Sequence, residues 1–236
     1  MDESGFGKSP PVPDQTKESQ IEILSGLEVA EKAQEIYDIL GPEIGCRFVE
    51  ANVILTIAGM KGMADIHEVK LDESKIQKID QLNSVIKKSG TRLGYPRKID
   101  DYSKPVQLSL YNKRFENNAQ ISESDSDDVY LGKLLGYPSQ AVLDSEDHHT
   151  KHKQGQDNPK KLIEFDIISS IPEASKYGGA VPDFDYYEEH KDNPEITEYI
   201  AKAKKILQEF YASDWHQNIS KNPDFQQARQ YPSKIK

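Results

Sequence analysis

NPEITEYIAKAKKILQEFYA, residues 193–212, carries the strongest structural signal in this chain. Asn193 is of the type that caps helices, Pro194 suits the first helical position, and Glu195 complements the positive end of a helix. The apolar residues have the spacing of one buried helical face; they are Ile196, Tyr199, Ile200, Ala203, Ile206, Leu207, Phe210 and Tyr211. The pattern predicts a long amphipathic helix that packs on its own core or, as the alternative, across the interface of a homodimer.

Two further helices have clear boundary signals. Ser25 and Glu28 have the spacing of a capping box, and Gly41 followed by Pro42 ends the helix that they begin. Asp72 is placed to cap another helix, whose apolar residues recur every three or four positions.

Strands are indicated where apolar and polar residues alternate. VQLSLY at 106–111 and LIEFDII at 162–168 have this alternation, and IHEVKL at 66–71 is a candidate neighbour. The run Val53–Ala58 is short, β-branched and followed by glycine, which favours a buried strand over a helix. Between these elements we expect a short helix over 129–135 and loops over 116–128, 145–161 and 177–190.

The interleaving of helices and strands predicts a single α/β or α+β domain over residues 21–215. The expected core is a mixed sheet of about four or five strands flanked by helices. Residues 1–20 contain little apolar surface and are expected to form a disordered N-terminal arm. Residues 216–236 are polar and are expected to form a mobile tail.

Composition restricts the classes of function. The formal net charge of −10 disfavours nucleic acid and anionic membranes as partners, since both require a concentrated positive face. Cys46 is the single cysteine, so neither an intramolecular disulfide nor a cysteine-based zinc site can form. The absence of a long apolar run or an apolar N-terminal signal region predicts a cytoplasmic protein.

The string Leu-Gly-Tyr-Pro occurs twice, at 93–96 and at 134–138 as LLGYP. An internal repeat would need similar flanking sequence, which the two copies lack. Glycine can end a helix in a left-handed conformation, and proline disfavours helix at the residue before it. Both copies are therefore interpreted as stops between a helix and a loop, with a binding role for Tyr137 as the alternative.

The second copy, within VYLGKLLGYPSQAV at 129–142, resembles an uncharacterised prokaryotic family catalogued as domain of unknown function four-eight-three. In that family the motif follows an acidic stretch and is followed by paired cysteines, and a later strand leads to a loop with proline and cysteine. The resemblance covers residues 46–210, with FDIISSIPEASKYGG at 165–179 matching the later strand and loop. This chain departs from it at Ser139, Gln140 and Ala141, and again at Glu173, Ala174 and Ser175, where cysteines would stand. The resemblance therefore implies no thiol chemistry, and the family supplies no activity to transfer.

Two clusters contain candidate chemical groups. DHHTKH at 147–152 places His148, His149 and His152 near acids, and a four-residue spacing on a helix suits a divalent metal. The polar surroundings favour adventitious or no metal binding, and no cofactor is expected. DFDYYEEH at 183–190 contains carboxylates that could act as acid and base if one were desolvated. The first candidates for catalysis are Tyr137, Asp183 and His190.

Two functions from different classes follow. The favoured one is a non-enzymatic cytoplasmic binding or adaptor module that presents loops 112–128 and 144–161 to a protein or small molecule. The alternative is a small hydrolase or metal-dependent enzyme with its site near Tyr137, His148–His152 and Asp183–His190. Nucleotide-dependent and serine-hydrolase functions are disfavoured, because the chain lacks a phosphate-binding loop, a dinucleotide fingerprint and a nucleophile elbow.

Overall fold

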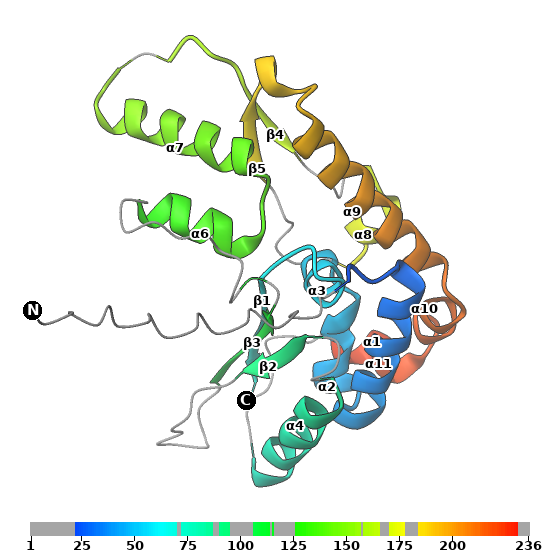
Figure 1. Cartoon of the computed structure of the whole chain (residues 1–236). Helices are drawn as coiled ribbons and strands as arrows, with labels where there is room; N and C mark the ends of the chain where they lie inside the picture. The colour runs from blue at the N-terminus through cyan, green and yellow to red at the C-terminus, as the bar shows by residue number, and fades with distance from the viewer. Residues whose placement is uncertain are drawn as a thin grey trace, which may run out of the picture.

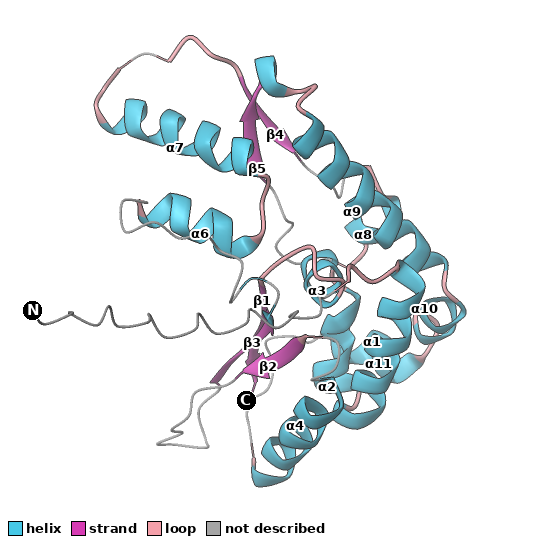
Figure 2. Cartoon of the chain, viewed as in Figure 1, coloured by secondary structure: helices cyan, strands magenta, loops and turns pink. Residues whose placement is uncertain are grey.

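The computed structural model describes residues 22–69, 72–86, 90–94, 106–113, 115, 126–156, 158–165, 170–177 and 184–230. The helices are α1 (Gly26–Leu40), α2 (Pro42–Gly45), η1 (Cys46–Val49), α3 (Ala51–Ile57), α4 (Glu73–Ile86), α6 (Asp127–Leu135), α7 (Ser139–Lys153), α8 (Pro172–Ser175), η3 (Glu188–His190), α9 (Pro194–Ala212), α10 (Asp214–Ile219) and α11 (Pro223–Gln230) (Figure 1). The strands are β1 (Met63–Val69), β2 (Thr91–Gly94), β3 (Val106–Asn112), β4 (Leu162–Phe165) and β5 (Phe184–Tyr187) (Figure 2). The expected disordered arm, residues 1–20, lies outside the described residues.

The described strands form two antiparallel sheets. One has the order β1-β3-β2, and the other pairs β4 with β5. Helices flank both sheets, and α9 runs from the β4–β5 region to the helices around α1 (Figure 1). The expected α/β or α+β class, with strands flanked by helices, is confirmed, although the described strands form two antiparallel sheets instead of one mixed sheet.

The long C-terminal helix and the first helix form the predicted packed pair. Ser25 Oγ accepts a hydrogen bond from Glu28 N–H, and Ser25 N–H donates to the Glu28 carboxylate, which completes the capping box. The Asn193 side chain accepts from Glu195 N–H at the start of α9. At the contact, Gly26 N–H donates to Glu209 Oε2 of α9 (2.9 Å).

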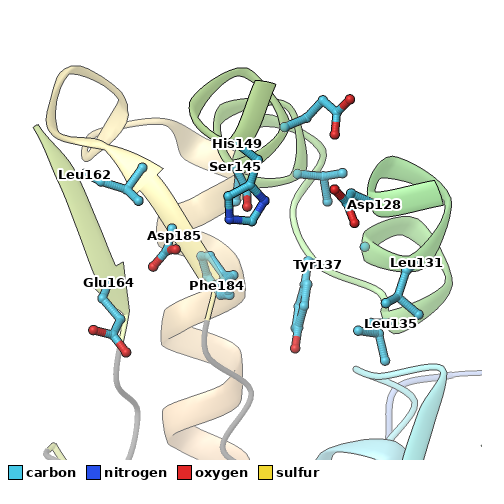
Figure 3. Close-up of a pocket in the computed structure, with 14 residues that line it drawn as sticks. Asp128, Leu131, Leu135, Tyr137, Ser145, His149, Leu162, Glu164, Phe184 and Asp185 are labelled. Atoms are coloured by element: carbon cyan, nitrogen blue, oxygen red, sulfur yellow. The ribbon is translucent and has the colours of Figure 1, made fainter. Parts of the chain in front are cut away.

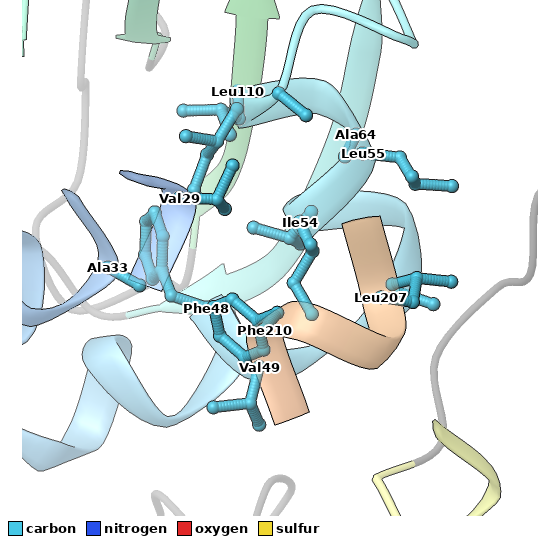
Figure 4. Close-up of a cluster of buried hydrophobic side chains, with 14 of the residues drawn as sticks. Val29, Ala33, Phe48, Val49, Ile54, Leu55, Ala64, Leu110, Leu207 and Phe210 are labelled. Atoms are coloured by element: carbon cyan, nitrogen blue, oxygen red, sulfur yellow. The ribbon is translucent and has the colours of Figure 1, made fainter. Parts of the chain in front are cut away.

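The apolar face of α9 is buried inside its own chain. Leu207 and Phe210 pack with Phe48, Val49 and Ile54 in the core (Figure 4). The intramolecular interpretation of the amphipathic pattern is therefore confirmed.

The run Val53–Ala58 was expected to be a strand, and this prediction is wrong. Residues 51–57 form α3, and all seven of its residues are buried. A helix enclosed on every side has no polar face, so the sequence shows neither helical nor strand periodicity. Its backbone bonds run to carbonyls four residues earlier, as in Ile54 N–H to Glu50 O.

Three segments expected to be loops or tail contain regular structure instead. Residues 145–153 belong to α7, and residues 184–187 of the expected 177–190 loop form β5. Within the expected mobile tail, residues 216–230 contribute to α10 and α11. Ile219 and Phe225 are buried there, and Trp215 and Ala228 pack against the core beside them, so apolar contacts hold both short helices in place.

Candidate functional site

A hollow of about 620 Å³ lies between α6, α7 and the β4–β5 sheet. We call it the acidic hollow. Its described lining residues are Asp128, Leu131, Gly132, Leu135, Tyr137, Ala141, Val142, Ser145, Glu146, His149, Leu162, Glu164, Phe184 and Asp185. Figure 3 shows the strand residues Leu162, Glu164, Phe184 and Asp185 on one side of it, and the α6 residues Asp128, Leu131 and Leu135 on the other.

The second Leu-Gly-Tyr-Pro string forms the corner between α6 and α7. Gly136 ends α6 in a left-handed conformation (φ 78°), and a Cβ there would lie 2.5 Å from the Phe115 ring. Pro138 then precedes α7, whose Ser139 N–H donates to Glu195 Oε1 of α9 (2.8 Å). The predicted helix stop is confirmed for this copy. In the first copy it is wrong, because Leu93 and Gly94 belong to β2, while Tyr95 and Pro96 lie outside the described residues.

Tyr137 stands at this corner with its ring between two hollows. The ring centre of Tyr137 lies 5.6 Å from the ring centre of Phe184 and 5.4 Å from Lys61 Nζ. A second hollow of about 690 Å³ lies beyond Tyr137 and Val142, towards Tyr199 of α9. Burial raises the pKa of Tyr199 well above its ordinary value, and its hydroxyl has no hydrogen-bond partner among the described residues. Tyr137 therefore lines both hollows in addition to its role in the turn.

Four carboxylates surround the acidic hollow. Glu164 of β4 and Asp185 of β5 are directly opposite each other in the register, a like-charge arrangement that destabilises a strand pair. Asp128 lies at the start of α6 and forms an exposed ion pair with Lys153 (3.6 Å). Glu146 lies on α7; within the described part of the chain, neither it nor Glu164 has an ion-pair or hydrogen-bond partner.

The predicted catalytic residue His190 lies elsewhere, in a structural network. Its Nδ1 is 2.7 Å from Asp144 Oδ2, which also accepts a hydrogen bond from Tyr187 N–H (3.0 Å). Gln140 Nε2 donates to Asp144 Oδ1 (2.8 Å). This carboxylate joins α7 to β5 and η3, and neither it nor His190 lines the acidic hollow. Asp183, the third catalytic candidate, lies outside the described residues.

The three histidines considered for metal binding lie on one helix, but they do not converge. His149 lines the acidic hollow, His148 Nδ1 is buried without a partner, and His152 is exposed. No group of three His, Cys, Asp or Glu side chains in the described ranges is close enough to hold one metal ion.

Sequence reasoning identified Tyr137, His149 and Asp185 as members of candidate clusters, but it missed Asp128, Glu146 and Glu164. Glu164 occupies the polar position of an alternating strand, which in isolation indicates only a solvated face. The register that places it opposite Asp185 cannot be obtained from either strand alone.

Comparisons with protein-family models, curated proteins and solved structures gave no match to this chain. The resemblance to the family of unknown function therefore stays a prediction based on the Leu-Gly-Tyr-Pro string. Among the described helices, none combines the length and apolar character required to cross a bilayer.

Proposed function

We propose that this protein is a non-enzymatic binding module whose ligand occupies the acidic hollow. The ligand class that fits is a positively charged molecule with an apolar portion. One observation carries the proposal: an apolar floor and four carboxylates share a single hollow of about 620 Å³. Hollows of this size suit small-molecule ligands. The described lining residues include acids but neither lysine nor arginine, so the hollow should attract a cation.

The floor supplies the apolar contact. Phe184 and Val142 are both buried, and Leu131 is 46% exposed at the edge. Covering such a leucine removes apolar surface from water, which is favourable by about 25 cal/mol per Å².

The arrangement of the polar groups supports ligand binding more than catalysis. Ser145 and His149 lie one turn apart on α7, but no hydrogen bond joins them, whereas a nucleophile and its base need hydrogen-bond reach. His190 and Asp144 are engaged with each other and with the Tyr187 backbone. The hydrolase or metal-enzyme alternative therefore has less geometric support. The expected cytoplasmic location belongs to the same proposal.

The test uses hexylamine as the cationic probe and hexanoate as its anionic counterpart. Hexylamine is expected to bind and to shift the NMR methyl signals of Leu131, Val142 and Leu162, whereas hexanoate leaves them unchanged. The spectrum of the amine itself should stay constant over a long incubation. New product signals would contradict the non-enzymatic part of the proposal.

Two exposed leucines provide a matched pair of variants. Leu131→Ala removes apolar surface from the hollow, while Leu27→Ala removes a comparably exposed side chain from α1. Only Leu131→Ala should weaken hexylamine binding, by about 3- to 10-fold for a partly buried leucine. Equal effects of the two changes, or hexylamine shifts confined to other methyl groups, would refute the acidic hollow as the binding site.

A further inference from the structure

Resting on the proposed function, we infer that the ligand is a linear aliphatic diamine or polyamine. Its two ammonium groups bind the two opposite sides of the acidic hollow, and the methylene chain between them covers the apolar floor.

The carboxylates fall into two groups on different elements. Glu164 and Asp185 belong to the paired strands β4 and β5, whereas Asp128 and Glu146 belong to the helices α6 and α7. Figure 3 shows Glu164 and Asp185 on the strand side and Asp128 across the hollow on the helix side. Negative charge is therefore present at two separate places.

The charge distribution favours two separated positive charges over one metal ion. Among the described residues, no three acidic, histidine or cysteine side chains approach one point closely enough to share an ion. Apolar side chains of Leu131, Val142 and Phe184 line the same hollow. A metal ion would leave this floor uncovered, whereas an aliphatic chain with an ammonium at each end contacts both features.

On the strand side, a bound cation would lie beside two carboxylates. Glu164 and Asp185 are directly opposite across β4 and β5, and like charges in that position repel. An ammonium group can donate hydrogen bonds to both carboxylates at once, because it has three N–H donors. On the helix side, Asp128 pairs with Lys153 at 3.6 Å, and both side chains are exposed (52% and 74%). Exposed pairs of this kind are weak, so a ligand ammonium can replace Lys153.

Calorimetric titration of the full chain with diaminohexane and with hexylamine tests the inference, because the two share chain length and differ in one ammonium. The diamine is expected to bind about tenfold more tightly, since a second ammonium contact of about 1.4 kcal/mol corresponds to that factor. In a series from diaminobutane to diaminodecane, affinity should pass through an optimum where the chain matches the span of the hollow. The preference for the diamine should decrease as salt is added.

Single charge-removing variants locate the two ammonium sites. Glu164→Gln and Asp128→Asn should each bring the affinity for diaminohexane down towards that of hexylamine. The control Glu31→Gln removes an exposed acid of α1, remote from the lining residues, and should leave both affinities unchanged. Circular dichroism of each variant verifies that the fold is retained.

Each other outcome has a definite meaning. If hexylamine and diaminohexane bind the hollow equally, or affinity rises steadily with chain length, the diamine inference is overturned while the proposed binding function stands. If a Lys-Leu-Leu-Lys peptide binds the hollow and diamines fail to compete with the peptide, the diamine inference is likewise overturned and the proposed binding function stands. If no amine shifts the hollow's methyl signals, both the inference and the proposed function are overturned.

Discussion

Replacing Asp144 by alanine tests how the α7–β5 unit that forms the acidic hollow is held together. The Asp144 carboxylate is 3% exposed and accepts from Tyr187 N–H, Gln140 Nε2 and His190 Nδ1. Loss of the carboxylate leaves the buried Tyr187 N–H without its acceptor, which costs about 1–3 kcal/mol. His190 and Gln140 are partly exposed and can turn to water, so each adds about 0.5–1 kcal/mol. The expected loss in the free energy of unfolding is about 3 kcal/mol.

Urea unfolding followed by far-UV circular dichroism measures this loss, provided that the slope of the free energy of unfolding against urea concentration is the same for the variant and the parent. A loss of this size in a domain of 150–250 residues lowers Tm by about 6–12 °C. The matched control is Asp38→Ala on the exposed face of α1, which should change stability by less than about 0.5 kcal/mol. A loss below about 1 kcal/mol for Asp144→Ala would refute the reasoning. A double-mutant cycle with His190→Ala then isolates the contribution of the histidine bond.

Three further predictions concern the core. Gly26→Ala should destabilise by about 1–3 kcal/mol in the same assay, because its Cβ would lie 2.1 Å from the Ile206 carbonyl oxygen of α9. Cys46 is 1% exposed and burial raises the pKa of its thiol, so Ellman's reagent should react slowly until the chain unfolds. Burial lowers the pKa of His216 in the folded state below its ordinary value of 6.5. As the pH falls below about 6.5, the unfolded state therefore binds a proton more readily than the folded state, and the free energy of unfolding should decrease. His216→Asn should flatten that decrease in urea titrations at pH 7.5 and 5.5.

The elements predicted correctly are those whose information is local. The boundaries of α1 and α9 follow from caps at Ser25 and Asn193, and β3 follows from its alternation. These signals depend on neighbours within a few residues, so a single sequence contains them. The Gly136 stop belongs to the same group.

The elements missed either depend on contacts that are distant in sequence or have only weak local signals. The residues of α3 are buried on every side by the surrounding elements, so its helical period is invisible. The second half of α7 has no buried residue, and its polar composition resembles that of a loop. That half is supported by the Asp147–Lys151 pair (2.6 Å) and by basic residues in its last turn, which complement the helix dipole. Both signals were present in the sequence, but each contributes only tenths of a kcal/mol, and the polar composition outweighed them.

The strand pair β4–β5 carries the charge arrangement from which the proposed cationic ligand is argued. Beyond one end of this pair, lysines face acids: Lys160 Nζ lies 2.7 Å from Glu189, and Lys161 Nζ lies 3.5 Å from Glu188. Within the hollow, the same two strands place Glu164 opposite Asp185. Ion pairs thus form beyond the end of the strand pair, whereas two acidic residues are opposite each other where the hollow is lined.

Glu164→Lys converts this acidic pair into an opposite-charge pair. The variant should gain about 0.5–1 kcal/mol in the free energy of unfolding, because repulsion across the strands becomes attraction. It should also lose hexylamine and diamine binding, since its own ammonium then occupies the strand side of the hollow. Urea unfolding and calorimetry on the same preparation measure both effects. A variant that is no more stable than the parent would show that the like-charge pair carries no energetic penalty, and the argument from that pair to a cationic ligand would fail.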